Sequence, residues 1–123
     1  MEELFVPYDL ALILKDKGFN KKCFGIHETF EDGDIFSLLP MPQSVDELPW
    51  YKHPAPLYQQ VVDWFREKYE IDIVISQDGD VFGEYAYRIY ESRYPHTRLG
   101  GDGGNWGYYK AFYKAIEYVL NLI

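Results

Sequence analysis

Cysteine is almost absent from this chain, and basic residues are scarce beside acidic ones. The single cysteine, Cys23, has no second cysteine for a disulfide, and a metal site cannot be assembled from thiolates alone. The 12 Lys and Arg residues stand against 20 Asp and Glu residues, which gives a net charge of −8. Because such a chain repels nucleic-acid phosphates, nucleic acid is an unfavourable partner. The single cysteine is expected in a reducing, cytoplasmic setting.

Long apolar runs are also missing. No stretch of about 18 consecutive apolar residues occurs, and the amino terminus has no basic region followed by an apolar run, so neither a membrane span nor a secretion signal is expected. The chain is nevertheless 47% hydrophobic, with 8 Phe, 12 Tyr and 3 Trp, which is far too apolar for disorder. Its 123 residues are typical of one domain, and a single domain over 1–123 is expected.

The spacing of apolar residues predicts an α+β fold in the order αββαββα. Pro7 suits a helix start and Gly18 a helix stop, while two Asp-Gly pairs are typical of hairpin turns. Prolines mark 40–55 as a surface connector, and glycines mark 92–107 as irregular. The two hairpins are expected to join into one antiparallel sheet of about four strands with helices on one face. The expected helices are 7–17, 56–69 and 108–123, and the expected strands are 23–29, 35–39, 71–76 and 81–91.

The segments 7–39 and 56–91 show a weak internal similarity of the form αββ. The turn Asp32-Gly33-Asp34-Ile35-Phe36 matches Asp78-Gly79-Asp80-Val81-Phe82. The alternative is that the same turn chemistry was selected twice without any duplication.

Neither the acidic turns nor the histidines form a recognisable reactive site. The turns lack the alternating ligands and the final Glu of a calcium loop. His27, His53 and His96 lie in separate segments, and Cys23 and His27 on one strand would be about 13 Å apart. No metal ligand, cofactor or catalytic residue is therefore predicted, and enzymatic activity is left open but disfavoured.

Aromatic density is the least ordinary feature of the sequence. Neighbouring aromatic residues cannot all point inward from one helix, so several rings should be exposed and favour a protein contact. The alternative is a core unusually rich in tyrosine. The candidate contact residues are Trp64, Trp106, Tyr109 and Tyr113.

A glycine-rich run over 99–107 suggests a second kind of site, a loop that closes over a small planar ligand. It resembles a phosphate cradle, but no Lys-Ser or Lys-Thr follows the glycines, and Asp102 would repel phosphate. The candidate ligand loop comprises Gly101, Asp102, Gly103, Gly104 and Asn105.

The segment Ala55–Tyr69, together with Val6-Pro7-Tyr8 and the closing 115–123, resembles small uncharacterised proteins of gut Bacteroides species and of their phages or mobile elements. No activity comes with that resemblance, which implies an intracellular accessory protein. The leading hypothesis is therefore a non-enzymatic interaction domain that binds a protein partner or forms a homodimer. A small-ligand binder is the alternative.

Overall fold

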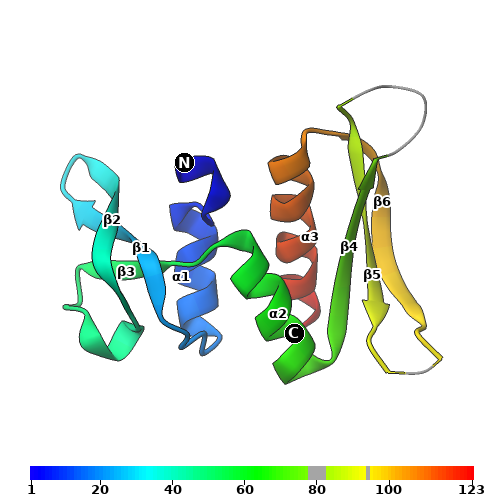
Figure 1. Cartoon of the computed structure of the whole chain (residues 1–123), viewed down its shortest axis with the longest axis horizontal. Coiled ribbons are helices and arrows are strands. Elements are labelled where there is room, and N and C mark those ends of the chain that lie inside the picture. The colour runs from blue at the N-terminus through cyan, green and yellow to red at the C-terminus, as the bar shows by residue number, and fades with distance from the viewer. Residues whose placement is uncertain (78–82, 94) are drawn as a thin grey trace. The chain divides into compact units, whose positions relative to one another are not determined.

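The computed structural model describes residues 1–77, 83–93 and 95–123 of the chain. Within them the fold is α+β, with three α-helices and six strands in two antiparallel sheets of three strands each (Figure 1). The chain divides into two compact units, Met1–Gln60 and Val61–Ile123, which we call unit 1 and unit 2. The boundary falls in the first turn of helix α2 (Tyr58–Tyr69).

The predicted α+β class and the three predicted helices are confirmed, but the single four-stranded sheet is wrong. Each predicted hairpin gains a third strand from a segment that prolines or glycines had marked as irregular, and two separate sheets result. The predicted turn at 77–80 and the start of the predicted strand 81–91 fall on residues 78–82, outside the described part of the chain.

Helix α1 (Tyr8–Asp16) covers one face of the unit 1 sheet. Pro7 is the N-cap and not the first helical residue, so the helix begins at Tyr8, one residue later than predicted. Gly18 ends the helix with a φ of 96°, which favours glycine, and the Phe19 amide donates to the Leu14 carbonyl at 2.9 Å. The buried side chains of α1 are Leu10, Ala11 and Leu14.

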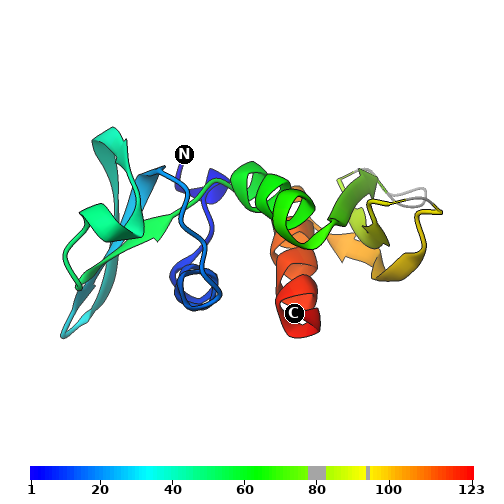
Figure 2. The same ribbon diagram turned by 90° about the horizontal axis from the view of Figure 1, so that it is seen from below.

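The unit 1 sheet has the strand order β2-β1-β3, with β1 (Cys23–Phe30) between β2 (Gly33–Gln43) and β3 (Lys52–Ala55). Both outer strands run antiparallel to β1, so the chain between them must cross the sheet. That connection includes a short 3-10 helix, η2 (Val45–Glu47), which lies on the side of the sheet away from α1 (Figure 2). Strand β3 was missed because its Pro54 reads as a loop residue, although an edge strand tolerates proline.

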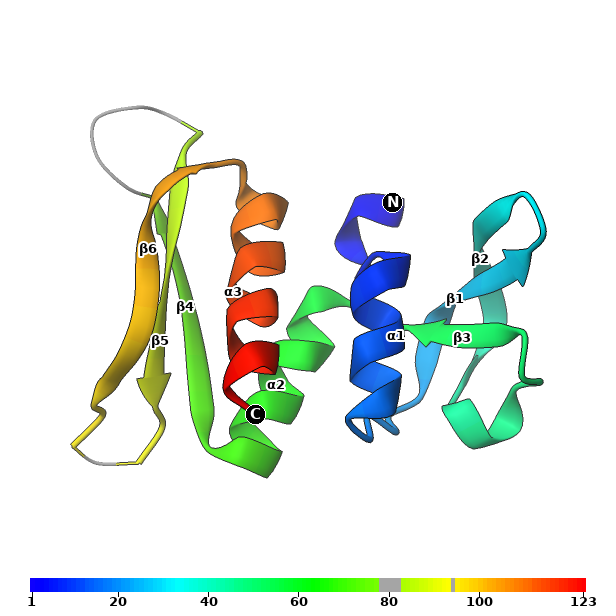
Figure 3. The same cartoon turned by 180° about the vertical axis from the view of Figure 1, so that it is seen from behind.

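The unit 2 sheet has the order β4-β5-β6, with β4 (Ile71–Gln77), β5 (Tyr85–Glu91) and β6 (Arg98–Trp106). Helix α3 (Tyr108–Leu122) lies along one face of this sheet (Figure 3). Its buried residues recur at helical spacing and comprise Ala111, Phe112, Ala115, Ile116, Val119 and Leu120.

The two units share a helix followed by an antiparallel hairpin, as the proposed αββ similarity requires. The third strand, however, joins the first hairpin strand in unit 1 and the second hairpin strand in unit 2. The similarity therefore ends at the hairpin. Among the described residues, each helix is too short or too polar to cross a membrane.

Candidate functional site

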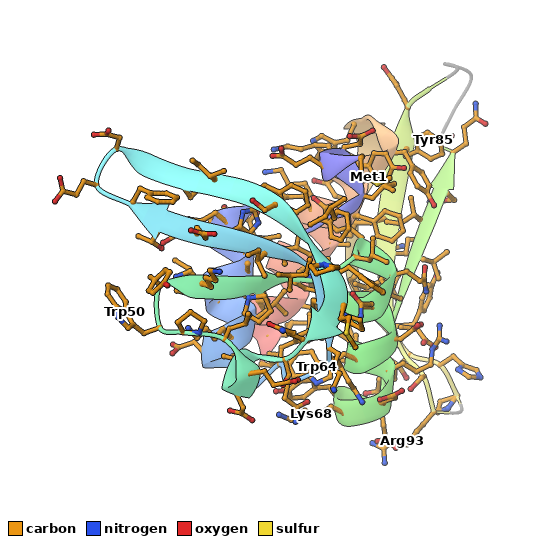
Figure 4. The ribbon with its side chains drawn as sticks, turned by 60° about the vertical axis from the view of Figure 1, so that its left-hand side comes forward. Met1, Trp50, Trp64, Lys68, Tyr85 and Arg93 are labelled. Atoms are coloured by element: carbon orange, nitrogen blue, oxygen red, sulfur yellow. The ribbon has the colours of Figure 1, made fainter. Side chains whose placement is uncertain are left out.

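Four large, exposed apolar side chains of unit 1 lie at the turn end of the β1–β2 hairpin or in the segment that leads into β3, while Phe24, Leu38 and Met41 are exposed toward the other end of the hairpin. Phe30 is 48% exposed, Ile35 56%, Trp50 82% and Tyr51 39%. The register pairs Ile35 and Lys52 with Glu28, and the Tyr51 carbonyl accepts from the Thr29 amide at 3.0 Å, so these segments are neighbours. Trp50 projects away from the ribbon (Figure 4). We call Phe30, Ile35, Trp50 and Tyr51 the hairpin-end patch.

Acidic residues border the hairpin-end patch. Glu31, Asp32 and Asp34 are exposed around the turn that joins β1 to β2. Glu28 lies between the strands and pairs with Lys52, with 3.8 Å between the Glu28 Oε1 and Lys52 Nζ atoms. Apart from that lysine, the border of the patch is therefore anionic.

A hydrogen-bond network on the α1-facing side of the sheet fixes β3 next to Tyr51. Lys15 Nζ lies 3.1 Å from His53 Nδ1, and His53 Nε2 lies 3.0 Å from Thr29 Oγ1. Thr29 Oγ1 is also 3.0 Å from the Tyr8 hydroxyl. The network joins α1, β1 and β3, and it holds β3 at the point where Tyr51 enters the strand.

The bonding partners assign the tautomer of His53. A lysine ammonium can only donate, so His53 Nδ1 accepts from Lys15 and the ring proton lies on Nε2. His53 then donates to Thr29, which is the reverse of the arrangement in which a histidine takes a proton from a nucleophilic hydroxyl. The geometry fits a structural role for the His53–Thr29 hydrogen bond and not the activation of Thr29 as a nucleophile.

His27 lies beside His53 across the β1–β3 ladder and is 3% exposed. Its Nε2 donates to the Val6 carbonyl at 2.9 Å, so the neutral ring carries a lone pair on Nδ1. Nδ1 is 3.5 Å from Asp34 Oδ2, which would be an ion pair only for a protonated ring. In the neutral ring two acceptors face each other, and Nδ1 has no hydrogen-bond partner among the described residues. Tyr8 packs edge-on against both histidines at 5.8 Å between ring centroids.

The lowered pKa of His53 predicts that unit 1 loses stability in mild acid. Burial, followed by the positive charge of Lys15 and the nearby His27, lowers the pKa of His53 below its ordinary value. The unfolded chain therefore binds a proton more readily, and the free energy of unfolding should fall as the pH drops from about 7.5 to about 5.5. Urea unfolding followed by tryptophan fluorescence at a series of pH values measures this slope.

Two histidine substitutions, one a test and one a control, establish the origin of this slope. His53→Gln should flatten the slope between about pH 7.5 and pH 5.5, whereas His96→Gln, at an exposed position of unit 2, should leave it unchanged. Equal slopes in the wild type and His53→Gln would show that His53 does not control the acid sensitivity.

The aromatic contact residues predicted from the sequence lie in unit 2, and one of them is buried. Trp64 is 3% exposed, and Lys68 lies over its ring at 5.1 Å (Figure 4). Trp106, Tyr109 and Tyr113 are half-buried. The Trp106 ring packs at a tilt against Tyr87, the Tyr109 ring packs edge-on against Tyr108, and Tyr113 lies beneath Lys110. Among the described residues the most exposed ring is instead that of Trp50, and the rings of Phe24, Phe30 and Tyr108 are each about half exposed; a sequence pattern alone did not distinguish them from core aromatics.

The predicted ligand loop, Gly101 to Asn105, forms part of strand β6, so the expectation of an irregular segment over 92–107 is wrong there. The glycines allow close packing: a Cβ on Gly104 would overlap the Tyr85 backbone. One on Gly100 would overlap the Tyr118 ring, whose hydroxyl donates to the Leu99 carbonyl at 3.1 Å. Close approach of strand to strand and of ring to strand accounts for these glycines.

Cys23 and the acidic side chains do not form a reactive centre in the described part of the chain. Cys23 is buried, and burial raises the pKa of its thiol to about 12, which suppresses the reactive thiolate. No group of three or more His, Cys, Asp or Glu residues among the described ones could hold a metal ion.

The surface chemistry of unit 1 is therefore the main guide to function: an exposed apolar patch, an acidic border and a hydrogen-bond network next to Tyr51. Comparison with known proteins finds no matching family, no similar curated protein and no similar solved structure.

Proposed function

We propose that the chain is a non-enzymatic protein-binding module, and that the hairpin-end patch is its contact surface. The observation that carries the proposal is the exposure of Trp50, Tyr51, Phe30 and Ile35 at one end of one sheet. Tryptophan and tyrosine dominate the binding energy of protein interfaces because each buries a large area with few rotatable bonds. Trp50 is the most exposed of these side chains and is the expected anchor.

The border of the patch indicates the chemistry of the partner. Glu31, Asp32 and Asp34 are exposed beside the aromatic residues, and acidic side chains outnumber basic ones in residues 1–60. A complementary surface presents an apolar pocket for Trp50 with Lys or Arg residues around it. Association should therefore slow as salt is raised, because screening weakens the attraction between the charged borders.

Affinity capture from a lysate of the source cells, read by mass spectrometry, tests the proposal with a matched pair of variants. The patch variant Phe30→Ala/Trp50→Ala should lose a stoichiometric protein partner that the wild type retains. The control variant Tyr109→Ala/Tyr113→Ala, in unit 2, should retain it. With the purified partner, Trp50→Ala alone should weaken binding about 30-fold or more in calorimetry, as expected for an interface anchor.

Two results would contradict this assignment. Loss of the partner from the Tyr109/Tyr113 variant but not from the patch variant would place the contact surface in unit 2. The absence of any stoichiometric partner for the wild type would remove the support for a protein-binding module.

A further inference from the structure

Of the six strands in the described residues, four lie at a sheet edge, and three of these four carry features that discourage pairing with another strand. Strand β2 contains Pro40 and Pro42 and has an irregular register against β1. Strand β3 has four residues, one of them Pro54. Strand β6 contains four glycines and has two register shifts against β5. Proline, short length and bulges are the devices by which proteins protect free edges.

Strand β4 has none of these devices. The segment Ile71–Gln77 contains no Pro, Gly, Lys or Arg, and its seven residues pair with β5 in an unbroken register. Three isoleucines and a valine give it high strand propensity. Within the described residues β4 pairs with β5 alone, so its other edge has unpaired backbone groups. Val74, 43% exposed, lies at the middle of this strand.

We propose that β4 is a self-association edge, on which β4 of a second copy of this chain pairs antiparallel about a two-fold axis at Val74. Side chains directly opposite each other lie on the same face of the sheet, so the two-fold axis, perpendicular to the sheet, must lie midway between two copies of the same residue. An axis at Val74 pairs all seven residues, whereas an axis at Ile73 or Ile75 pairs fewer. The product is a continuous six-stranded sheet with the buried faces of both copies on one side.

The charges on β4 fit this register. Asp72 is the only charged residue of the strand and would lie opposite Ser76 of the second copy, so no like charges face each other directly. In each chain Arg66 binds Asp72, and Arg88 donates to the Ser76 hydroxyl at 3.1 Å. The pairing therefore places the Asp72 carboxylate of one copy beside the Arg88 guanidinium of the other, at both ends of the interface.

The dimer should be weak and should strengthen with salt. A single strand-to-strand contact buries an area at the low end of protein interfaces, which corresponds to a micromolar to millimolar dissociation constant. Each chain carries a net charge of −8, so two copies repel each other at long range. Screening this repulsion by raising the salt from about 0.05 M to about 0.5 M should favour the dimer. The proposal uses unit 2 only and does not depend on the hairpin-end patch.

Sedimentation velocity of the full chain from about 5 µM to about 500 µM tests the proposal, because a weak dimer appears only as the concentration rises. The wild type should pass from monomer towards dimer. Val74→Lys should weaken dimerisation at least tenfold, because it sets two like charges opposite each other on the axis. Val74→Thr keeps a neutral β-branched residue and should dimerise nearly as well as the wild type. Urea midpoints of all variants establish that each is folded.

A mixture of two opposite variants tests the two-fold axis itself. Val74→Lys and Val74→Glu should each be monomeric alone and should form a heterodimer when mixed, because lysine then lies opposite glutamate. Failure of the mixture to associate would overturn the register. A wild type that stays monomeric at about 500 µM in both salt conditions, or a Val74→Lys variant that dimerises as the wild type does, would overturn the proposal.

Discussion

Replacing Gly25 with valine is expected to lower the free energy of unfolding by about 3 kcal/mol, at the upper end of the cost of overpacking. Gly25 lies in β1, the central strand of unit 1, and pairs with Leu38 on one side and Ala55 on the other. A Cβ at this position would lie 2.7 Å from Phe5 Cδ1 and 2.8 Å from the Ala55 carbonyl oxygen. The Phe5 ring can turn aside, but the carbonyl belongs to the β1–β3 ladder and cannot.

The measurement is urea unfolding at neutral pH, with Gly107→Ala as the control. Nothing lies within 4 Å of a Cβ on Gly107, which precedes helix α3 with a φ of −64°. The control should therefore cost no more than about 1 kcal/mol, the loss expected when alanine replaces glycine at an N-cap. A Gly25→Val protein as stable as that control would mean that β1 and β3 are not packed as closely as the structure has them.

The helices were predictable from the sequence because their signals are local. Pro7, the apolar spacing after it and Gly18 fall within one short segment, and the helix they predict is present as α1. The Asp-Gly pair at Asp32-Gly33 likewise predicted the β1–β2 hairpin, with Gly33 at a φ of 134°.

The third strand of each sheet was not predictable, because its sequence favours a loop and its pairing is decided by distant residues. Pro54 has no backbone donor, yet β3 forms at a sheet edge where one fewer donor is tolerated. The glycines of β6 favour an irregular chain, yet Gly100 and Gly104 leave room for Tyr118 and for the Tyr85 backbone. Without β3, no pattern could bring His27 beside His53 or place Trp50 and Tyr51 at the hairpin end.

Replacing His27 with alanine is expected to cost about 3 kcal/mol, since it combines a buried cavity with a lost hydrogen bond. The His27 ring is buried between α1 and the sheet, where it contacts Tyr8 and Phe36. Its Nε2 proton satisfies the Val6 carbonyl, and Val6 is fully buried at the entry to α1. Alanine would remove the ring contacts and leave that carbonyl without its donor.

A His27→Phe variant separates the two contributions, because phenylalanine keeps an aromatic ring, slightly larger than the imidazole, at this position and donates no hydrogen bond. It also removes the buried Nδ1 atom, which has no hydrogen-bond partner in the part of the chain that the structure describes, so part of the cost should be recovered. We therefore expect His27→Phe to fall between the wild type and His27→Ala in urea unfolding at about pH 7.5, where the unfolded-state histidine is neutral. Equal losses in both variants would assign the whole effect to the Val6 hydrogen bond. A loss below about 1 kcal/mol in both would contradict the buried placement of His27, because such a site does not tolerate truncation so cheaply.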